Sequence, residues 1–220
     1  CTRSCKFCNV KTGRPAPLDP AEPENIANSV KLLGLKHAVI TSVDRDDLAD
    51  LGAAHWVKVI EAVKRVNPET TMEVLIPDFQ GRRELVQQVI EARPEVISHN
   101  LETVRELSDG VRSRAKYDTS LQVIRQVSES GIVSKSGIML GLGETREQIL
   151  RTMDDLLAVG CKVMTIGQYL QPSEANLEVK EYVTPETFQE YERIGLEKGF
   201  RYVESGPLVR SSYHAEKHVR

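Results

Sequence analysis

The chain contains 220 residues, of which 40% are hydrophobic and 28% are charged, and its formal net charge is −3. This composition is ordinary for one soluble globular domain, and we expect residues 1–220 to form a single domain. The small net charge and the lack of a long apolar run give no indication of a nucleic-acid or membrane surface.

The first eight residues contain three of the four cysteines, Cys1, Cys5 and Cys8. Thiolates are soft ligands that suit zinc or iron–sulfur clusters. A structural zinc site needs four ligands, whereas a cubane cluster held by three thiolates keeps one iron free to bind a further group. A zinc knuckle that lacks one ligand, or a disulfide with a spare thiol, remains an alternative at this point.

The spacing Cys-x3-Cys-x-Phe-Cys resembles the radical S-adenosylmethionine (SAM) superfamily. In that superfamily SAM chelates the open iron of a [4Fe–4S] cluster, and an electron from the cluster cleaves SAM to methionine and a 5′-deoxyadenosyl radical. The resemblance implies that Cys1, Cys5 and Cys8 are the metal ligands and that the cluster and SAM are the cofactors.

The sequence begins with Cys1 rather than Met. Because catalytic loops of α/β barrels follow strands, we expect a fragment whose first barrel strand precedes Cys1. Four cysteines in a chain of this length do not make a disulfide framework, which favours a reducing compartment.

Strands and helices alternate after a polar, proline-containing loop at 9–20. Hydrophobic periodicity and end signals predict helices at 20–34, 53–66, 83–92, 119–130, 145–159 and from 185 onward, and strands at 37–43, 72–76, 95–98, 133–140, 162–166 and 200–204. This order predicts a parallel α/β sheet. Five strands before the loop at 170–183, together with the strand expected before Cys1, fit a partial (β/α)6 barrel of the TIM type. A doubly wound open sheet is the alternative.

Polar motifs follow several of these strands, at the edge where barrel enzymes place their active sites. A carboxylate at Glu102 could accept ribose hydroxyls, or it could only favour a helix dipole. Glycines at 141 and 143 could admit a ligand, or they could form a tight turn. The charged loop at 44–48 could orient the amino group of SAM or a lysyl substrate, or it could be a solvated turn. The candidate cofactor-binding residues are Asp46, Asn100, Glu102, Gly141, Gly143 and Glu144.

Six segments in the same order resemble the lipoyl synthase family across nearly the whole chain. They are residues 1–15, 42–48, 99–104, 141–145, 167–173 and 210–214. The family inserts two sulfur atoms, at C6 and C8, into an octanoyl chain that is amide-linked to a lysine of a carrier domain. It uses two [4Fe–4S] clusters, of which one cleaves SAM and the second, auxiliary cluster is consumed as the sulfur source. The resemblance implies that a serine of the Arg-Ser-Ser-Tyr motif at 210–213 is a metal ligand of the auxiliary cluster, and we assign Ser212, with Ser211 as the fallback.

Two departures from the family pattern qualify this expectation. The family's three cysteines for the auxiliary cluster lie N-terminal to the first cluster motif, and this sequence does not include them. We therefore expect this chain alone to bind one cluster and cleave SAM without completing sulfur insertion; a content of about eight irons would contradict that expectation. In addition, Leu51 stands where the family usually has glycine, and residues 174–180 are less basic than in the family.

The resemblance also implies partners and a location. We expect an octanoylated lipoyl carrier domain or a glycine-cleavage H-type protein, an electron donor such as flavodoxin or ferredoxin, and no nucleic acid or membrane. The expected location is the bacterial cytoplasm, or a mitochondrion or plastid in a eukaryote. Another radical SAM sulfur-inserting enzyme, resembling biotin synthase, and a non-catalytic zinc-binding α/β domain are the alternative functions.

Overall fold

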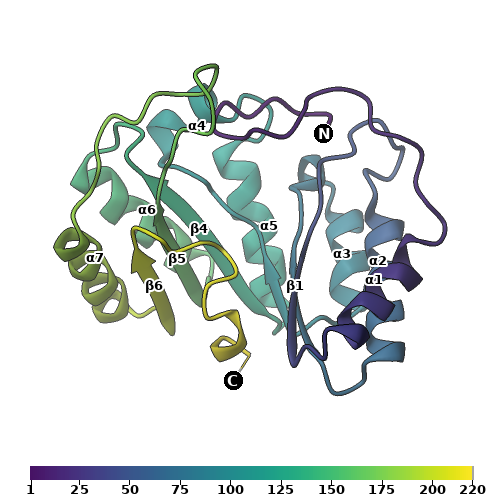
Figure 1. The fold of residues 1–220 in the computed structure, drawn as a ribbon. Coiled ribbons are helices and arrows are strands. Elements are labelled where there is room, and N and C mark those ends of the chain that lie inside the picture. The colour runs from purple at the N-terminus through teal and green to yellow at the C-terminus, as the bar shows by residue number, and fades with distance from the viewer. Residues whose placement is uncertain (220) are drawn as a thin grey trace.

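Six parallel strands form one curved sheet in the computed structural model, which describes residues 1–219 (Figure 1). The strands are β1 (His37–Thr41), β2 (Thr71–Leu75), β3 (Val96–Ser98), β4 (Val133–Leu140), β5 (Val163–Gln168) and β6 (Tyr202–Gly206). Each strand pairs with the next one along the chain. A doubly wound sheet would reverse this order at a switch point, so the structure favours the partial barrel over that alternative.

The described part of the chain has seven helices, of which α4 lies at the upper edge and the others lie on the outer side of the sheet (Figure 1). They are α1 (Glu22–Leu32), α2 (Ala53–Val66), α3 (Arg83–Glu91), α4 (Arg105–Val111), α5 (Tyr117–Glu129), α6 (Arg146–Ala158) and α7 (Pro185–Lys198), with short 3₁₀ turns η1 (Phe79–Gly81) and η2 (Ala215–Lys217). Within residues 1–219, no helix is both long and apolar enough to cross a membrane.

The apolar core lies between the sheet and these helices, in two main clusters. In the first cluster, side chains of α1, α2 and α3 pack together with residues such as Trp56 and Ile60. In the second cluster, side chains of α6 and α7, such as Met153 and Phe188, pack against the later strands. Since the apolar packing lies outside the sheet, the concave inner face is left for polar groups and cavities.

The predicted α/β barrel is confirmed, with two differences in detail. The sequence prediction did not count the strand at 200–204 among the barrel strands, whereas in the structure this strand is β6 and pairs with β5. The sequence also did not predict α4, because this helix has only seven residues, one of which is Gly110.

Residues 1–14 cross the upper edge of the sheet, where the carboxyl ends of the strands lie (Figure 1). Loops that follow β1, β2 and β3 rise beneath this segment. The fold therefore brings the cysteine-containing loop over the barrel mouth.

Candidate active site at the barrel mouth

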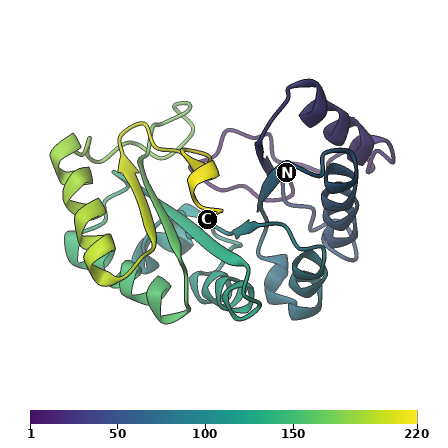
Figure 2. The ribbon, with the colours of Figure 1, turned by 90° about the horizontal axis from the view of Figure 1, so that it is seen from below.

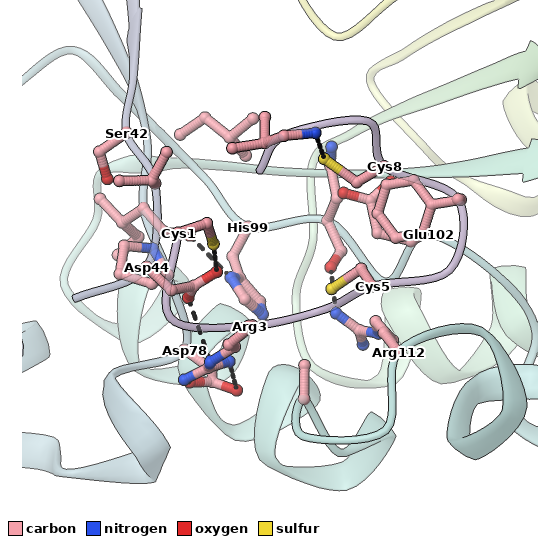
Figure 3. A pocket seen from close by; sticks show the side chains of 18 residues that line it. Cys1, Arg3, Cys5, Cys8, Ser42, Asp44, Asp78, His99, Glu102 and Arg112 are labelled. Atoms are coloured by element: carbon pink, nitrogen blue, oxygen red, sulfur yellow. Dashed lines mark hydrogen bonds and ion pairs between the residues drawn. The ribbon is translucent and has the colours of Figure 1, made fainter. Parts of the chain in front are cut away.

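Three cysteines line one cavity of about 220 Å³ at the carboxyl ends of β1, β2 and β3 (Figure 3). The loop that carries them is closed by two backbone hydrogen bonds, from Cys8 N to Cys5 O at 3.0 Å and from Gly13 N to Cys1 O at 2.9 Å. Glu102, which the sequence analysis singled out, lines the same cavity. The structure thus brings Cys1, Cys5 and Cys8 together with Glu102.

Arg3 anchors the cysteine loop to the barrel, and it is the only buried residue among the first fourteen. Its guanidinium donates two hydrogen bonds to Asp46, each at 2.9 Å, and two to Asp78, at 2.9 and 2.7 Å. Burial opposes the charge on Arg3, but Asp46 and Asp78 more than offset it, so the pKa of Arg3 is raised. The loop is therefore held by buried ion pairs rather than by apolar packing.

The Cys5 thiol faces this cavity and is protonated near neutral pH when no cation is bound. Burial raises the pKa of Cys5 to about 11, and the nearby carboxylates of Asp44 and Glu102 add to the shift. The Cys1 thiol donates to Asp44 Oδ2 at 3.7 Å. Metal coordination requires thiolates, so cluster binding at this loop releases protons.

The donor set suits a cluster better than a single ion. Within residues 1–219, no three His, Cys, Asp or Glu side chains lie close enough together to hold one metal ion. A zinc ion would draw its sulfur ligands to about 3.8 Å from one another. A cubane cluster instead binds each thiolate at a separate iron corner, and three thiols spaced around a cavity fit that requirement.

Glu102 has a backbone conformation that an L-residue rarely adopts, with φ of 66°. Two hydrogen bonds to β4 hold it there, from Glu102 N to Gly137 O and from Met139 N to Glu102 O, each at 2.9 Å. The left-handed region costs a non-glycine residue about 1–2 kcal/mol. Strain of this kind clusters at ligand sites, where the rest of the fold enforces it.

Asn100 and the Glu102 carboxylate supply acceptors on the cavity wall. Burial raises the pKa of Glu102, while the positive charge of Arg112 opposes the shift. Asn100 Oδ1 is buried and has no hydrogen-bond partner among the described residues. An unpaired buried acceptor at a cavity indicates that a ligand or water completes it.

Arg112 is a site residue that sequence reasoning missed. It lies beside Cys5 and Glu102 (Figure 3), buried, and donates to Asn100 O and Ser120 Oγ at 2.9 Å each. Its position follows from α4, which the sequence did not predict, so no local signal marked it. Arg3 and Asp78 were missed for a similar reason, since their pairing joins residues 75 positions apart.

A second cavity of about 290 Å³ continues from the first along the inner face of β4 and β5. Phe7, Leu75, Asn100 and Glu102 line both cavities, which therefore adjoin. Gly137 lines this cavity, and a Cβ there would lie 2.3 Å from Thr165 Oγ1, so a larger residue does not fit without a shift. We refer to this second cavity as the groove. Its apolar lining residues are Phe7, Leu75, Ile138, Met139, Tyr169, Leu170 and Val209.

Four other predicted cofactor-binding residues are not among the residues that line either cavity. Asp46 uses its carboxylate to hold Arg3, and Asp44 from the same loop lines the first cavity instead. The Glu144 carboxylate accepts from Gly141 N at 2.6 Å and so braces the turn of Gly141 and Gly143. The predicted role of Asp46, Gly141, Gly143 and Glu144 in cofactor binding stays a prediction.

The Arg-Ser-Ser-Tyr motif lines the groove through Arg210 and its first serine. Ser211 lines the groove, whereas Ser212 is exposed and is not among the lining residues. The assignment of a metal ligand to Ser212, with Ser211 as the fallback, stays a prediction, and the geometry favours the fallback. Cys161 lies buried far along the sheet, as expected for a small apolar residue.

Comparisons with known proteins agree with this site. A family model described as the radical SAM superfamily matches residues 1–156. A lipoyl synthase from Treponema denticola is 72% identical over 219 residues, covering 100% of this chain and 76% of that protein. A lipoyl synthase from Phocaeicola vulgatus is 66% identical over 220 residues, covering 100% of this chain and 78% of that protein.

Two solved structures show the same fold at low sequence identity. HydG, a maturase of the [FeFe]-hydrogenase, aligns with a TM-score of 0.74 and 14% identity over 100% of this chain and 52% of that chain. Streptococcus suis SuiB bound to S-adenosylmethionine aligns with a TM-score of 0.69 and 14% identity over 93% of this chain and 47% of that chain. Because the curated relatives share more than 60% identity over the whole of this chain, the chain belongs to the lipoyl synthase family of the radical SAM superfamily.

Proposed function

We propose that this chain carries the radical chemistry by which sulfur is inserted at C6 and C8 of an octanoyl chain bound to a carrier lysine. One observation supports this above all others: a cavity lined by three thiols opens directly into an apolar groove. A ligand at the first cavity and a chain in the groove would then lie within contact of each other.

Cys1, Cys5 and Cys8 would hold a [4Fe–4S] cluster, with SAM in the rest of the first cavity. When bound, the cluster and SAM supply a carbon-centred radical that can abstract hydrogen from an unactivated carbon. The Arg3 ion pairs fix the loop that presents the thiols. The Glu102 carboxylate can accept hydrogen bonds from ribose hydroxyls, and Asn100 Oδ1 offers a further acceptor.

The groove suits an acyl chain. Apolar side chains from β2, β4, the cysteine loop and the segments that follow β5 and β6 line one part of it. Polar side chains line the rest, namely Asn100, Glu102, Thr165, Gln168, Arg210 and Ser211. An apolar chain in this position would exclude water from the space beside the first cavity, which protects a reactive intermediate. Gly137 lines the groove without adding a side chain to it.

The auxiliary cluster and the partners complete the proposal. Ser211 at the groove wall, or Ser212 next to it, would provide the oxygen ligand of the auxiliary cluster. An octanoylated lipoyl carrier domain or H-type protein would deliver the chain, and flavodoxin or ferredoxin would deliver electrons. Free, partly exposed thiols suit a reducing compartment such as the bacterial cytoplasm.

Anaerobic reconstitution tests the cluster assignment. The wild-type chain should be brown and should cleave SAM to 5′-deoxyadenosine when a chemical reductant is added. Cys5→Ala should abolish this cleavage, whereas the matched control Cys161→Ala should retain it, because Cys161 is buried away from both cavities. A colourless chain that holds stoichiometric zinc would support the zinc-binding alternative.

An isotope experiment tests the substrate class without requiring sulfur transfer. A peptide that carries octanoyl-lysine deuterated at C6 should transfer deuterium into 5′-deoxyadenosine. An acetyl-lysine peptide is the control, because its acyl group is too short to fill the groove. SAM cleavage without deuterium transfer would retain the radical SAM chemistry and would contradict the octanoyl substrate.

A further inference from the structure

A lysine with no exposed side-chain surface lies inside the barrel, below the groove. Lys135 points inward from β4, two residues before Gly137, and its Nζ lies 2.9 Å from Glu73 Oε2 of β2. The Glu73 side chain also has no exposed surface, and its other oxygen accepts a hydrogen bond from Ser98 Oγ at 2.9 Å. None of these three residues lines either cavity of the active site.

The ammonium of Lys135 also reaches a different part of the chain. It donates to the carbonyl of Ser211 at 2.5 Å, and it lies 3.4 Å from Nδ1 of His218. A lysine ammonium has three donors and no acceptor. One donor therefore serves Glu73, and the other two face the C-terminal segment, which we define as residues 207–219.

The C-terminal segment lies on the open side of the barrel, between β6 and β1 (Figure 2). Its η2 turn contacts β1, and the His218 ring lies 5.5 Å from the Tyr202 ring of β6. Gly167 of β5 allows the segment to approach, since a Cβ there would lie 2.4 Å from Val209 O. The segment therefore crosses the side at which the sheet does not close on itself.

A contribution to stability alone does not explain the fully buried ion pair of Lys135 and Glu73. Replacing a buried ion pair by apolar residues of similar volume is often neutral or stabilising, while removal of one partner is strongly destabilising. An apolar side chain at 135 could fill the interior of the barrel. It could not donate a hydrogen bond to the Ser211 carbonyl, which is the feature that links the barrel to the C-terminal segment.

We infer that Lys135 is a positioning residue whose ammonium, held by Glu73, fixes the backbone at Ser211 and thereby keeps the Arg-Ser-Ser-Tyr motif at the wall of the groove. The claim that this wall contacts substrate or the auxiliary cluster rests on the proposed function. The claim that Lys135 orders the C-terminal segment does not.

The test is amide hydrogen exchange of the double variant Lys135→Met/Glu73→Gln, which removes both charges together. Peptides from 207–219 should exchange at least about tenfold faster than in the wild type, because a charge-assisted hydrogen bond is lost. Peptides from β2 and β4 should keep their wild-type rates. Lys162→Met is the matched control, since Lys162 is exposed and next to β5, and it should leave every rate unchanged.

Two further measurements guard against a simple folding defect. His218→Leu leaves Lys135 and Glu73 in place and changes only the C-terminal segment and its contact with Tyr202 of β6. It should also speed exchange within 207–219, so it decides the question if the double variant does not fold. In the deuterium-transfer assay, the double variant should raise the KM for the octanoyl peptide more than it lowers kcat, whereas a merely destabilised core would lower the amount of active protein.

The inference would be overturned if a folded double variant exchanged residues 207–219 at wild-type rates. If the double variant is unfolded, wild-type rates in His218→Leu would overturn it. The exchange measurement does not depend on turnover. If the wild-type chain transfers no deuterium from the octanoyl peptide, the proposed function fails, and the exchange result still decides the role of Lys135.

Discussion

Replacement of Arg3 by methionine should release the cysteine loop without unfolding the barrel. Arg3 is the only buried residue of the first fourteen, and its side chain is 5% exposed. Its four hydrogen bonds to Asp46 and Asp78 have donor–acceptor distances between 2.7 and 2.9 Å. Methionine has a similar length but cannot pair with either carboxylate, so the loop would lose its main attachment.

The expected magnitude follows from the buried pairs. Loss of one partner from a buried ion pair costs about 3–5 kcal/mol. Asp46 keeps hydrogen bonds from Thr2 and Gln80, at 3.1 and 3.0 Å, so the lower end of that range applies. About 3 kcal/mol corresponds to at least about a hundredfold change in an equilibrium constant. This change should appear in the retention of the cluster, because the loop can detach locally.

The assay is anaerobic loss of the cluster to an iron chelator, followed by visible absorbance. Arg3→Met should lose the cluster at least about a hundredfold more readily than the wild type. Arg3→Lys should fall in between, since lysine keeps the charge but not the paired geometry. Arg193→Met, which removes an exposed pair with Glu197 on α7, is the control. An Arg3→Met chain that retains its cluster as well as the wild type would refute the reasoning.

Three further predictions concern the same cavities. Arg3 lowers the pKa of Asp46 in the folded chain. A carboxyl group with such a lowered pKa stabilises the fold at a pH above its unfolded-state pKa, which is near 4. This stabilisation is lost as the pH falls toward the folded-state pKa. Residues 1–14 of the cluster-free chain should therefore exchange amide hydrogens faster below about pH 4, and an Arg3→Met chain with the same acid dependence would contradict this. Glu102→Gln should weaken SAM binding by about tenfold or more, because one charged hydrogen-bond acceptor is lost, while the cluster is retained. Equilibrium dialysis measures the affinity, and an unchanged affinity would show that Glu102 does not contact SAM. Gly137→Ala should destabilise the chain by about 1–3 kcal/mol, measured by thermal unfolding, because its Cβ would meet Thr165 Oγ1. A Gly137→Ala/Thr165→Ala variant that recovers none of this loss would show that the contact is not the cause.

The sequence was sufficient for the architecture because hydrophobic periodicity is local. The predicted helix at 53–66 and the predicted strand at 133–140 match α2 and β4. The cysteine spacing is also local, and it places three ligands on one loop whatever the rest of the fold. Helix α4 was missed because it is too short for its periodicity to be read.

Side-chain pairing across the fold could not be read in the same way. Arg3 meets Asp46 and Asp78, which lie 43 and 75 positions away, and nothing near any of the three in the sequence indicates the contact. The same limit applies to Asp46: the sequence did not show that its carboxylate pairs with Arg3, and its role toward a cofactor stays a prediction. Glu102 was identified because it follows a strand, but its left-handed backbone was not visible in the sequence.

The two layers inside the barrel follow from the period of a β-strand. Lys135 and Gly137 are two residues apart on β4, so they face the same side, one above the other. At the upper level Gly137 lines the groove and lies close to Thr165, where a larger residue would not fit. At the level below, the interior is filled by the charged pair of Glu73 and Lys135 instead of by apolar side chains. The remaining donors of Lys135 face the C-terminal segment, which lines the groove through Val209, Arg210 and Ser211. A charged layer beneath the groove thus allows an open site above it.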